Sequence, residues 1–515
     1  MKMRNVKALQ ALSRGCALAL ACLLAACSPQ SDEGGQDMGA GEAEAPMAAP
    51  MPAAEPAGPA PGDAMEEALN LRLVGHHDLQ GRSAYHPIPH RYGERMIFFV
   101  GHHAGEAMNP LTGQVEVNGM SVLDVTDPAA PVLLRHEPPT GEAGFTQHIQ
   151  VCNGDALPNA DPDKVYLVRT NGNIGAELLD VTDPANPVFL STVQTTGETD
   201  DGRRQTHKIQ WDCETGIAYL NGTPEGWRVA RVLQIYDLGN PDEPRHIRDF
   251  GLADSRPGAT GPRGTALHQP FVNGNRVYMG YGASGNGVVQ ILDRDKLLSG
   301  DPQAEDPFAP TPENLLYPQI SRLNMPSYYG AHTAKPIYGV EIADYADNAE
   351  HRVLDLLLLV SEETTDECAS DRDVMFLVDI TEEDKPFPIS TFQVPEEPGD
   401  FCHRGVRFGP HSPQDVYHPS FDKTLVVLAY FNAGTRVVDI RDPFSPREVG
   451  YYIPPVTDRT MELCNDERGV ESCSTQIQTN NVNLDDRGYI YALDRAGTGV
   501  HILELTGEAR RIAGL

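Results

Sequence analysis

Seven segments of this chain share one pattern: a β-branched apolar run, an acidic residue, a turn and a second apolar run. The clearest copies are SVLDVTDPAAPVLL from Ser121, ELLDVTDPANPVFL from Glu177 and TRVVDIRDPFSPREVG from Thr435. The acidic position of the seven copies falls at Asp124, Asp180, Asp237, Asp293, Asp379, Asp439 and Glu504, with spacings of 56, 57, 56, 86, 60 and 65 residues. A unit of this size cannot bury its own apolar face, so the copies must pack on one another.

Each repeat contains the material for four short strands. Runs such as MIFFVG, KVYLVRT and LVVLAYF precede the repeated phrase, and Gly, Pro, Asn and Asp separate the runs. This pattern, with 48 Gly, 42 Pro and an aromatic share of 7%, is typical of all-β proteins. Seven four-stranded antiparallel sheets close most naturally into a propeller, which leaves no exposed sheet edge. We therefore predict a seven-bladed β-propeller of four-stranded blades over residues 69–515.

Two terminal segments compete to close this ring. The segment LNLRLVGHHD, which begins at Leu69, reads as an outer strand that precedes the first repeat. It would pair with the last repeat. The closing segment ARRIAGL, which begins at Ala509, is the alternative. The sequence leaves both open.

The repeats resemble the LVIVD repeat, a propeller-forming unit found mainly in bacterial surface and exported proteins. The phrases NAGTRVVDIRDPFSPREVGYYIPP and LLDVTDPANPVFLSTV carry the resemblance, which covers about residues 69–515. The segment Val289–Gly300 departs from the consensus because it lacks the Pro-containing turn, and Glu504 replaces the usual Asp. The resemblance implies a fold, because the repeat is a scaffold motif that assigns no activity.

The N-terminus has the features of a targeting segment. Four basic residues precede an apolar run over Cys16–Leu24, which is followed by Leu24-Ala25-Ala26-Cys27. This arrangement resembles the bacterial lipoprotein signal. The resemblance implies that residues 1–26 are a signal peptide, that Cys27 is lipidated, and that more than one acyl chain anchors the protein firmly. We expect an exported, lipid-anchored protein at the outer membrane, the periplasmic face or the cell surface.

Residues 27–68 form a linker rich in Ala, Pro and Glu, and this composition predicts a disordered acidic tether. The chain has a net charge of −33, which becomes more negative once the basic signal is removed. That charge argues against nucleic acid as a partner and against docking on anionic lipid head groups. No body segment is apolar for 18 residues, so none is expected to span a bilayer. We expect a monomer that meets the membrane through its lipid and that binds a protein or a small ligand.

Nine cysteines become six once Cys16, Cys22 and the anchor Cys27 are set aside. An even number in an exported protein indicates disulfides. One pair brackets a polar loop, one falls at similar points of consecutive repeats, and one remains. These expected pairs are Cys464–Cys473, Cys152–Cys213 and Cys368–Cys402. No CxxC motif occurs, which argues against a zinc ribbon or a thioredoxin-type site.

Histidines recur at the start of the first strand of the repeats. They are His86, His148, His207, His268, His332 and His411, and the seventh repeat has Asn480 instead. Inner strands of a propeller line its channel, so these side chains would converge on a common axis. Neutral imidazole is a frequent ligand for copper, zinc and iron. A subset of three or four could hold one transition-metal ion and leave a coordination position open for water or substrate.

His148 is the weakest of the six, because the phrases TQHIQV and THKIQW set it opposite Lys208 rather than His207. Either a bulge restores its direction or it faces the other way. A second interpretation applies to the whole set. A histidine at this position can hydrogen-bond the next blade and simply join neighbouring sheets, or it can line a water-filled channel.

Four insertions between strands are candidate lids over one mouth of the channel, or tolerated surface loops. They are Leu298–Gly330, which we expect to join repeats four and five, Glu362–Asp373, Glu396–Gly409 and Asp458–Ser474. Six arginines near strand ends are candidate contacts for an anionic ligand, and nothing in the sequence selects among them. They are Arg91, Arg169, Arg203, Arg228, Arg404 and Arg407.

Two functions are compatible with the sequence. The first is a membrane-anchored binding or scaffold propeller for a protein, glycan or small ligand. The second is a metal-dependent enzyme, a copper oxidoreductase or a zinc or iron hydrolase, that uses the channel histidines. Its distant analogue is the methanethiol oxidase family, a propeller whose copper is held by His. The chain has no GxSxG, Walker, HExxH or Rossmann motif, so whether it is an enzyme stays open.

Overall fold

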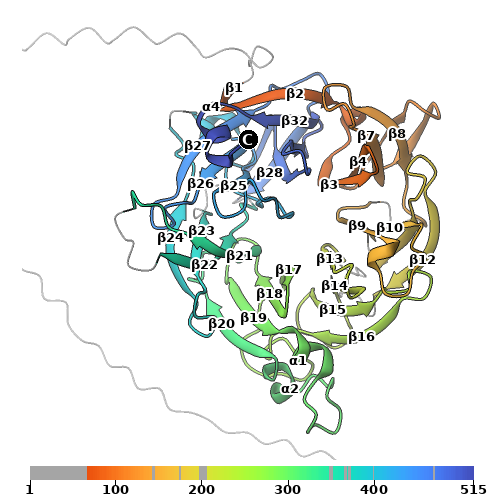
Figure 1. Ribbon diagram of the computed structural model, residues 1–515, viewed down its shortest axis with the longest axis vertical. Helices are drawn as coiled ribbons and strands as arrows, with labels where there is room; N and C mark the ends of the chain where they lie inside the picture. Colours follow the sequence, from red (N-terminus) through yellow and green to blue (C-terminus); the bar gives the residue numbers. More distant parts are fainter. Residues whose placement is uncertain are drawn as a thin grey trace, which may run out of the picture. The chain divides into compact units, whose positions relative to one another are not determined.

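A computed structural model of the chain shows a seven-bladed β-propeller, as predicted (Figure 1). The structure describes residues 67–515, apart from 142–144, 173–174, 196–205, 347–351, 365–367, 369–372, 398 and 468–469. The predicted signal peptide, Cys27 and nearly all of the predicted linker lie outside the described residues. The first strand begins at Glu67, so Glu67 and Ala68 belong to regular structure rather than to the linker.

The first five blades are antiparallel sheets whose strands run outward from the channel in chain order. Blade one is β3 (Ala84–Tyr92), β4 (Arg95–His102), β7 (Met120–Asp124) and β8 (Val132–Glu137). Blade two is β9 (Ile149–Asn153), β10 (Val165–Asn171), β11 (Gly175–Asp180) and β12 (Val188–Gln194). Blade three is β13 (Ile209–Trp211), β14 (Ile217–Gly222), β15 (Val232–Asp237) and β16 (Arg245–Phe250). Blade four is β17 (Leu267–Asn273), β18 (Arg276–Tyr281), β19 (Val288–Asp293) and β20 (Gln319–Asn324). Blade five is β21 (Thr333–Glu341), β22 (Val353–Val360), β23 (Met375–Asp379) and β24 (Phe387–Phe392).

The last two blades take strands from both ends of the chain. Blade six contains β25 (Leu425–Ala429), β26 (Thr435–Asp439) and β27 (Arg447–Ile453), with β1 (Glu67–Leu69) along its outer edge. Its innermost segment joins β25 through a single bridge, Pro413 opposite Leu428. Blade seven is β30 (Thr479–Leu484), β31 (Ile490–Asp494), β32 (Gly499–Leu505) and, outermost, β2 (Leu71–His77). The N-terminal segment therefore closes the ring, and ARRIAGL lies largely in helix α4 (Gly507–Ala513).

In six of the seven repeats the acidic residue, always Asp, ends the third strand and caps the turn or helix that follows, whereas Glu504 lies within β32 and pairs with Arg72. Asp124 accepts a hydrogen bond from the N–H of Thr126, and Asp180 from the N–H of Thr182, both at 2.9 Å. Such Asx turns fix the chain reversal into the fourth strand. In the fourth repeat Asp293 instead caps helix α1 (Arg294–Ser299), where it accepts from the N–H of Lys296 at 3.0 Å. The missing Pro-containing turn thus becomes a helix.

This helix changes the interpretation of the first insertion. The segment Leu298–Gly330 does not simply join repeats four and five, because it contains α2 (Pro312–Leu316) and β20, the fourth strand of blade four. Helices α1 and α2 are inserted between the third and fourth strands, so the fourth strand begins later in the sequence than in the other repeats. The expectation was wrong on this point.

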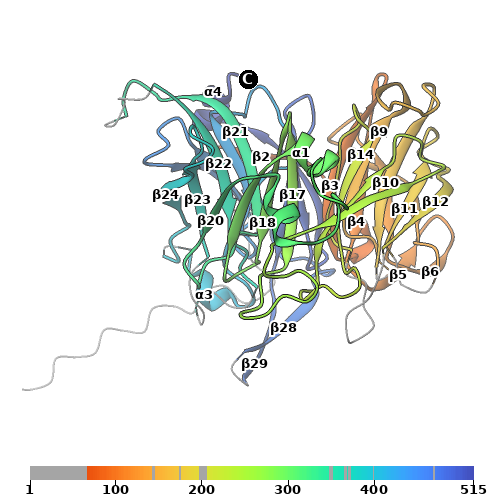
Figure 2. The same cartoon turned by 90° about the horizontal axis from the view of Figure 1, so that it is seen from below.

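The other insertions follow second or fourth strands, so they lie at the end of the ring where the innermost strands begin. We call this end the inner-strand mouth. Figure 2 shows α3 (Phe401–Arg404), the hairpin β28 (Glu462–Glu467) and β29 (Val470–Thr475), and the pair β5 (Glu106–Asn109) and β6 (Gln114–Val117) on this side. Helices α1 and α4 lie on the opposite side (Figure 2).

The core lies between adjacent blades. Among the described residues, seven apolar clusters occur, one at each blade interface. In β22, Leu356 and Leu358 pack toward blade six, whereas Leu357 and Leu359 pack toward blade four. Successive side chains of a strand point to opposite faces, and here both faces are buried. This explains why the second strands read as continuous apolar runs.

The three expected disulfides are present. They are Cys152–Cys213, Cys368–Cys402 and Cys464–Cys473. The first joins blades two and three, and the third lies across the hairpin of β28 and β29. Three disulfides indicate an oxidising environment outside the cytoplasm. In the part of the chain that the structure describes, no helix is long and apolar enough to cross a bilayer.

Candidate metal centre

The six histidines predicted to line the channel are all brought together and sort into two groups. The first group, here the imidazole chain, consists of His207, His268, His332 and His411 from blades three to six. Successive ring centroids are 4.9, 3.5 and 4.8 Å apart. The second group, here the imidazole pair, consists of His86 and His148, whose rings stack at 3.7 Å.

His148 joins the pair because the backbone ahead of β9 is irregular. The Thr170 hydroxyl oxygen accepts the N–H of both Gln147 and His148, at 2.9 and 3.1 Å. Both side chains consequently enter the site. His148 stacks on His86, and the Gln147 Oε1 lies 2.7 Å from the His207 Nδ1. The local irregularity, not the regular alternation of a strand, gives His148 its direction.

Asn480, at the seventh position, contributes its backbone rather than its amide. Its carbonyl oxygen accepts a hydrogen bond from the His411 Nδ1 at 2.5 Å. Its side-chain amide donates to the Asn481 Oδ1, also at 2.5 Å. Asn480 therefore orients a histidine of the imidazole chain.

Three members of the imidazole chain have their Nδ1 proton fixed. The His268 Nδ1 lies 3.0 Å from the backbone oxygen of His332, and the His411 Nδ1 faces the oxygen of Asn480. The His207 Nδ1 faces the Gln147 Oε1. These oxygens accept only, so each Nδ1 carries the proton and donates it. The Nε2 atom of each ring is left with a lone pair.

Two of these lone pairs face each other. The Nε2 atoms of His207 and His268 are 3.1 Å apart. Burial lowers the pKa of both imidazoles well below the usual value, so neither carries a second proton at neutral pH. Two nitrogen ligands of a tetrahedral ion lie about 3.3 Å apart, given Zn–N bonds of about 2.0–2.1 Å. The separation therefore matches an edge of a metal coordination shell.

Carboxylates complete two clusters. Glu362, in the loop after β22, places one oxygen 3.3 Å from the His332 Nε2 and the other 3.6 Å from the His411 Nε2. Asp415 lies 2.7 Å from the His86 Nε2 and 3.7 Å from the His148 Nε2. The ligand atoms of His268, His332 and Glu362 all lie within 4.8 Å of one another, as do those of the imidazole pair and Asp415.

The two clusters differ in which ring nitrogen of the histidines carries the proton. The His86 Nδ1 accepts a long hydrogen bond, 3.5 Å, from the N–H of Ile149, so its Nε2 carries the proton and donates to Asp415. In contrast, His207, His268 and His411 of the imidazole chain direct unprotonated Nε2 atoms inward. A third cluster of Cys368, Cys402 and Glu396 is not a metal site, because the two cysteines form a disulfide.

Tyr85 lies between the elements of the site. Its hydroxyl is 3.1 Å from the His207 Nε2, and its ring meets those of His103 and His411 edge-on. Burial raises the pKa of Tyr85 well above the usual value, so it is a neutral phenol. The Lys208 ammonium lies 4.8 Å from the centre of the Tyr85 ring.

Sequence reasoning missed Tyr85, Lys208, Glu362 and Asp415. The two carboxylates belong to a total of 73 acidic residues, and neither falls in the repeated phrase. The one available signal was position, because Glu362 opens a predicted insertion and Asp415 follows His411 by four residues. Tyr85 and Lys208 are sequence neighbours of His86 and His207, but adjacent residues of a regular strand point apart.

Most other histidines and the candidate arginines lie elsewhere. His76 lies against His501 in blade seven with the two rings tilted, His90 contacts Asn153, and His403 is exposed. Of the six arginines, Arg407 reaches Glu362 at 3.4 Å. Four have other contacts: Arg91 with Asp486, Arg169 with Glu177, Arg228 with the backbone oxygen of Asp254, and Arg404 with Glu67. Arg203 lies outside the described residues.

No family model matches the chain, and no curated protein matches it. Among solved structures, it is similar to the crystal structure of Saccharomyces cerevisiae Sqt1. The match has 6% sequence identity and a TM-score of 0.43, and it covers 84% of this chain and 98% of that chain.

Proposed function

We propose that the channel holds one transition-metal ion on the imidazole chain and Glu362, and that the protein is a metal-dependent enzyme. One observation carries this proposal: the Nε2 atoms of His207 and His268 face each other at 3.1 Å while both Nδ1 protons are held by oxygens. Metal-binding histidines commonly donate the other ring N–H to a carbonyl or carboxylate in this way. A cation shared by the two lone pairs would remove their repulsion.

The donor set narrows the choice of metal. Nitrogen and carboxylate oxygen without sulfur suit zinc, copper and iron. Zinc or iron would activate a bound water for hydrolysis, and copper or iron would support oxidation. The Tyr85 hydroxyl, beside His207, is placed to hydrogen-bond a molecule at the ion. The Asp415 carboxylate, held by His86, is a second polar group on the opposite cluster.

The interpretation of the histidines as joints between blades is compatible with this proposal. The bond from the His268 Nδ1 to His332 connects blades four and five, and the bond from the His411 Nδ1 to Asn480 connects blades six and seven. These bonds use Nδ1 alone. They give no role to the inward Nε2 atoms.

A binding or scaffold role for a protein, glycan or small ligand is the second candidate. The propeller fold is consistent with it, and the insertions gathered at the inner-strand mouth favour it (Figure 2). A rigid ring that presents variable loops is a common interaction surface. The same loops would act as a lid in the enzyme.

The cellular placement is also part of the proposal. We infer an exported protein of LVIVD repeats, lipidated at Cys27 and anchored in a membrane. The repeated phrases, the Leu24-Ala25-Ala26-Cys27 sequence and the three disulfides support it. Mass spectrometry of the membrane-extracted protein would show an acylated peptide that begins at Cys27. Recovery of an unmodified Cys27 would contradict the anchor.

Metal content tests the central proposal. The protein is purified without chelator, and bound metal is measured by inorganic mass spectrometry. We expect stoichiometric zinc, copper or iron in the natural protein and its loss in the double variant His207→Ala, His268→Ala. The control is His136→Ala, because His136 is buried in blade one and bonds Ser121 and Val117, away from the site.

A thermal melt separates the two roles of the histidines. We expect the double variant to lose the metal and to melt at the same temperature as the natural protein stripped of metal. Equal melting temperatures would mean that the two imidazoles contribute to stability only through the ion. A natural protein that binds no metal after reconstitution with any of the three ions would overturn the proposal.

A further inference from the structure

Four cationic side chains surround the proposed metal centre. Lys208 and Arg231 come from blade three, Arg407 from the insertion before blade six and Arg495 from blade seven. The charge of Arg231 is the largest electrostatic influence on His207 after burial, and the charges of Lys208 and Arg495 act in the same way on His411. These cations therefore lie near the imidazole chain and come from several blades.

Lys208 is the cation whose position most needs explanation. Its side chain is fully buried, and its ammonium has no hydrogen-bond partner among the described residues. A second buried lysine provides the contrast. The Lys335 ammonium donates to the backbone oxygens of Gln414 and Val416, at 2.9 and 2.8 Å. A buried ammonium without such partners is strongly unfavourable, so the position of Lys208 calls for an acceptor from outside the chain.

The balance of charges around the site also favours a negatively charged ligand. Glu362, Asp415 and, beside Arg495, Asp494 are the carboxylates near these four cations, and a divalent metal would add two further positive charges. Burial lowers the pKa of Arg495 to about 10, so Arg495 remains charged at neutral pH. The Nε atom of Arg231 is also buried without a partner in the described part of the chain. A site of this charge would be neutralised by a negative ligand.

We propose that the substrate of this site is a small anion whose oxyanion group, a carboxylate or a phosphate, is bound by Lys208 together with Arg231 and Arg495. This inference rests on the proposed metal-dependent function and names its class of substrate. The metal would hold the reacting part of the molecule, and the cations would hold its charged group. Lys and Arg are the side chains suited to such oxyanions.

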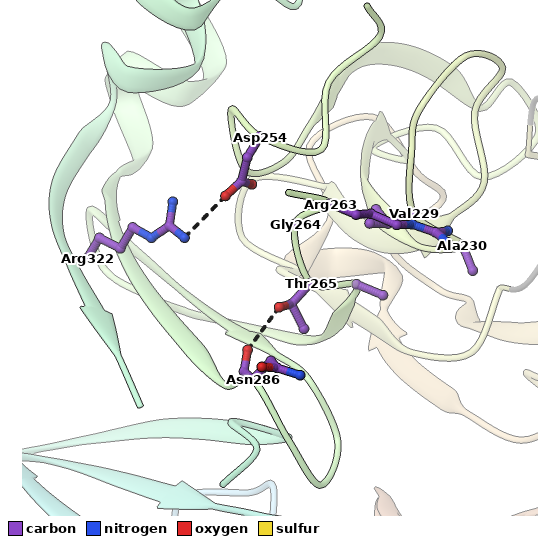
Figure 3. Close-up of a pocket in the computed structure, with 9 residues that line it drawn as sticks. Val229, Ala230, Asp254, Arg263, Gly264, Thr265, Asn286 and Arg322 are labelled. Carbon is purple, nitrogen blue, oxygen red and sulfur yellow. Dashed lines mark hydrogen bonds and ion pairs between the residues drawn. The ribbon is translucent and has the colours of Figure 1, made fainter. Parts of the chain in front are cut away.

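The inner-strand mouth also carries a cavity of net positive charge. This cavity, of about 550 Å³, lies over blades three and four and is lined by Arg263, Arg322 and Asp254, among others (Figure 3). Arg322 pairs with Asp254 at 3.5 Å. The lining residue Ala230 directly precedes Arg231, and Ala266 lies two residues before His268. Because Arg322 is paired with Asp254, the Arg263 guanidinium leaves this cavity with a net positive charge, which would attract anions although the chain as a whole is acidic.

Calorimetric titration of the full chain tests the proposal. The probes are acetate and inorganic phosphate, with acetamide as the neutral analogue of acetate, all at one ionic strength. The protein is used free of metal and loaded with cobalt(II), whose visible bands report changes at the ion. We expect one of the anions to bind and to perturb the cobalt bands, and acetamide to do neither. The preferred anion identifies the group as carboxylate or phosphate.

Variants assign the binding to the cations. Lys208→Met should weaken anion binding at least tenfold while cobalt is retained, and Lys208→Arg should preserve most of the affinity. Lys164→Met is the control, because that ammonium pairs with Asp180 in blade two, and it should leave the anion affinity unchanged. Arg495→Met provides an independent variant if Lys208→Met does not fold, and we expect the same tenfold loss.

Two outcomes would overturn the inference. One is the absence of anion binding in both forms of the natural protein. The other is equal anion affinity in the natural protein and in the Lys208 and Arg495 variants, which would leave an adventitious ion only. Failure of the metal proposal is recognised separately, because it appears as an absence of bound cobalt while the anion titration of the metal-free protein still reports on the cations.

Discussion

At the scale of single residues, the two nitrogens of a channel histidine do different work. The Nδ1 atom carries a proton and bonds an oxygen of a neighbouring blade, as in His268 and His411. That bond fixes both the ring orientation and the tautomer, so the Nε2 atom presents a lone pair at a defined place. A repeated structural bond thereby prepares the proposed metal site.

Gln147 performs this positioning for His207, and its loss tests the idea. In Gln147→Leu, the His207 Nδ1 loses its acceptor, so the ring can rotate or exchange tautomers. We expect metal affinity to fall by about 10- to 100-fold, measured by competition with a chelator. Gln290→Leu is the control, because Gln290 is a buried glutamine that bonds Tyr281 and Gln319 in blade four. Unchanged affinity in Gln147→Leu would show that this contact does not position the ligand.

The sequence allowed part of the candidate site to be predicted. The positions of four histidines could be predicted because the repeat places each at the same point of its blade, and equivalent points of a ring converge on its axis. They are His207, His268, His332 and His411. Glu362 could not be predicted, because it reaches the centre from a loop whose path no periodicity determines. Lys208 could not be predicted either, because its entry depends on the irregular backbone at the head of the inner strand. Residues placed by loops and irregular backbone leave no periodic signal.

At the scale of elements, the ring is closed by β2, the outermost strand of blade seven, which comes from the N-terminal end of the chain. Strand β2 pairs with β32 from Leu71 opposite Leu505 to His77 opposite Val500. The repeat pattern predicted that a terminal strand would close the ring, but two segments had suitable apolar residues. The choice follows from conformation: the C-terminal segment forms a helix, and only the N-terminal segment continues the ladder.

The contact between β2 and β32 contains a pH-sensitive pair. His76 and His501 face each other across the two strands with ring centroids 4.8 Å apart. Burial, and then the neighbouring His76, lower the pKa of His501 from 6.5 to about 3. Because this pKa lies below the unfolded value, the unfolded state takes up the proton first as the pH falls. The stability from a neutral His501 is complete above about pH 6.5 and is lost progressively toward pH 3.

Replacement of His501 should therefore reduce acid sensitivity. In His501→Phe, we expect the loss of unfolding free energy between pH 7 and pH 4 to shrink by about 3 kcal/mol, measured by urea titration at both values. His403→Phe is the control, because His403 is exposed and bonded only to Asp400 among the described residues. An identical acid response in His501→Phe and the natural protein would show that other groups dominate acid unfolding.

At the scale of the whole molecule, seven apolar interfaces are stabilised only while the ring is closed. Leu71, on the closing strand, belongs to the cluster between blades six and seven. Closure also sets the spacing of the inner strands, and thus the distances within the imidazole chain. The fold itself was predictable from the sequence, because seven copies of a unit that cannot stand alone have few ways to bury their faces.

Two truncations isolate the contribution of the closing strand. A chain that begins at residue 67 retains β1 and β2, whereas a chain that begins at residue 78 lacks both. We expect the first to melt as the natural protein does. The second should melt about 5–10 °C lower, because several kcal/mol of strand pairing and Leu71 burial are removed from a large domain. It should also lose metal affinity, because the first and last blades are then free to separate and the imidazoles with them. Equal melting temperatures for the two truncations would mean that the ring is held by its blade interfaces alone and that β2 merely covers an edge.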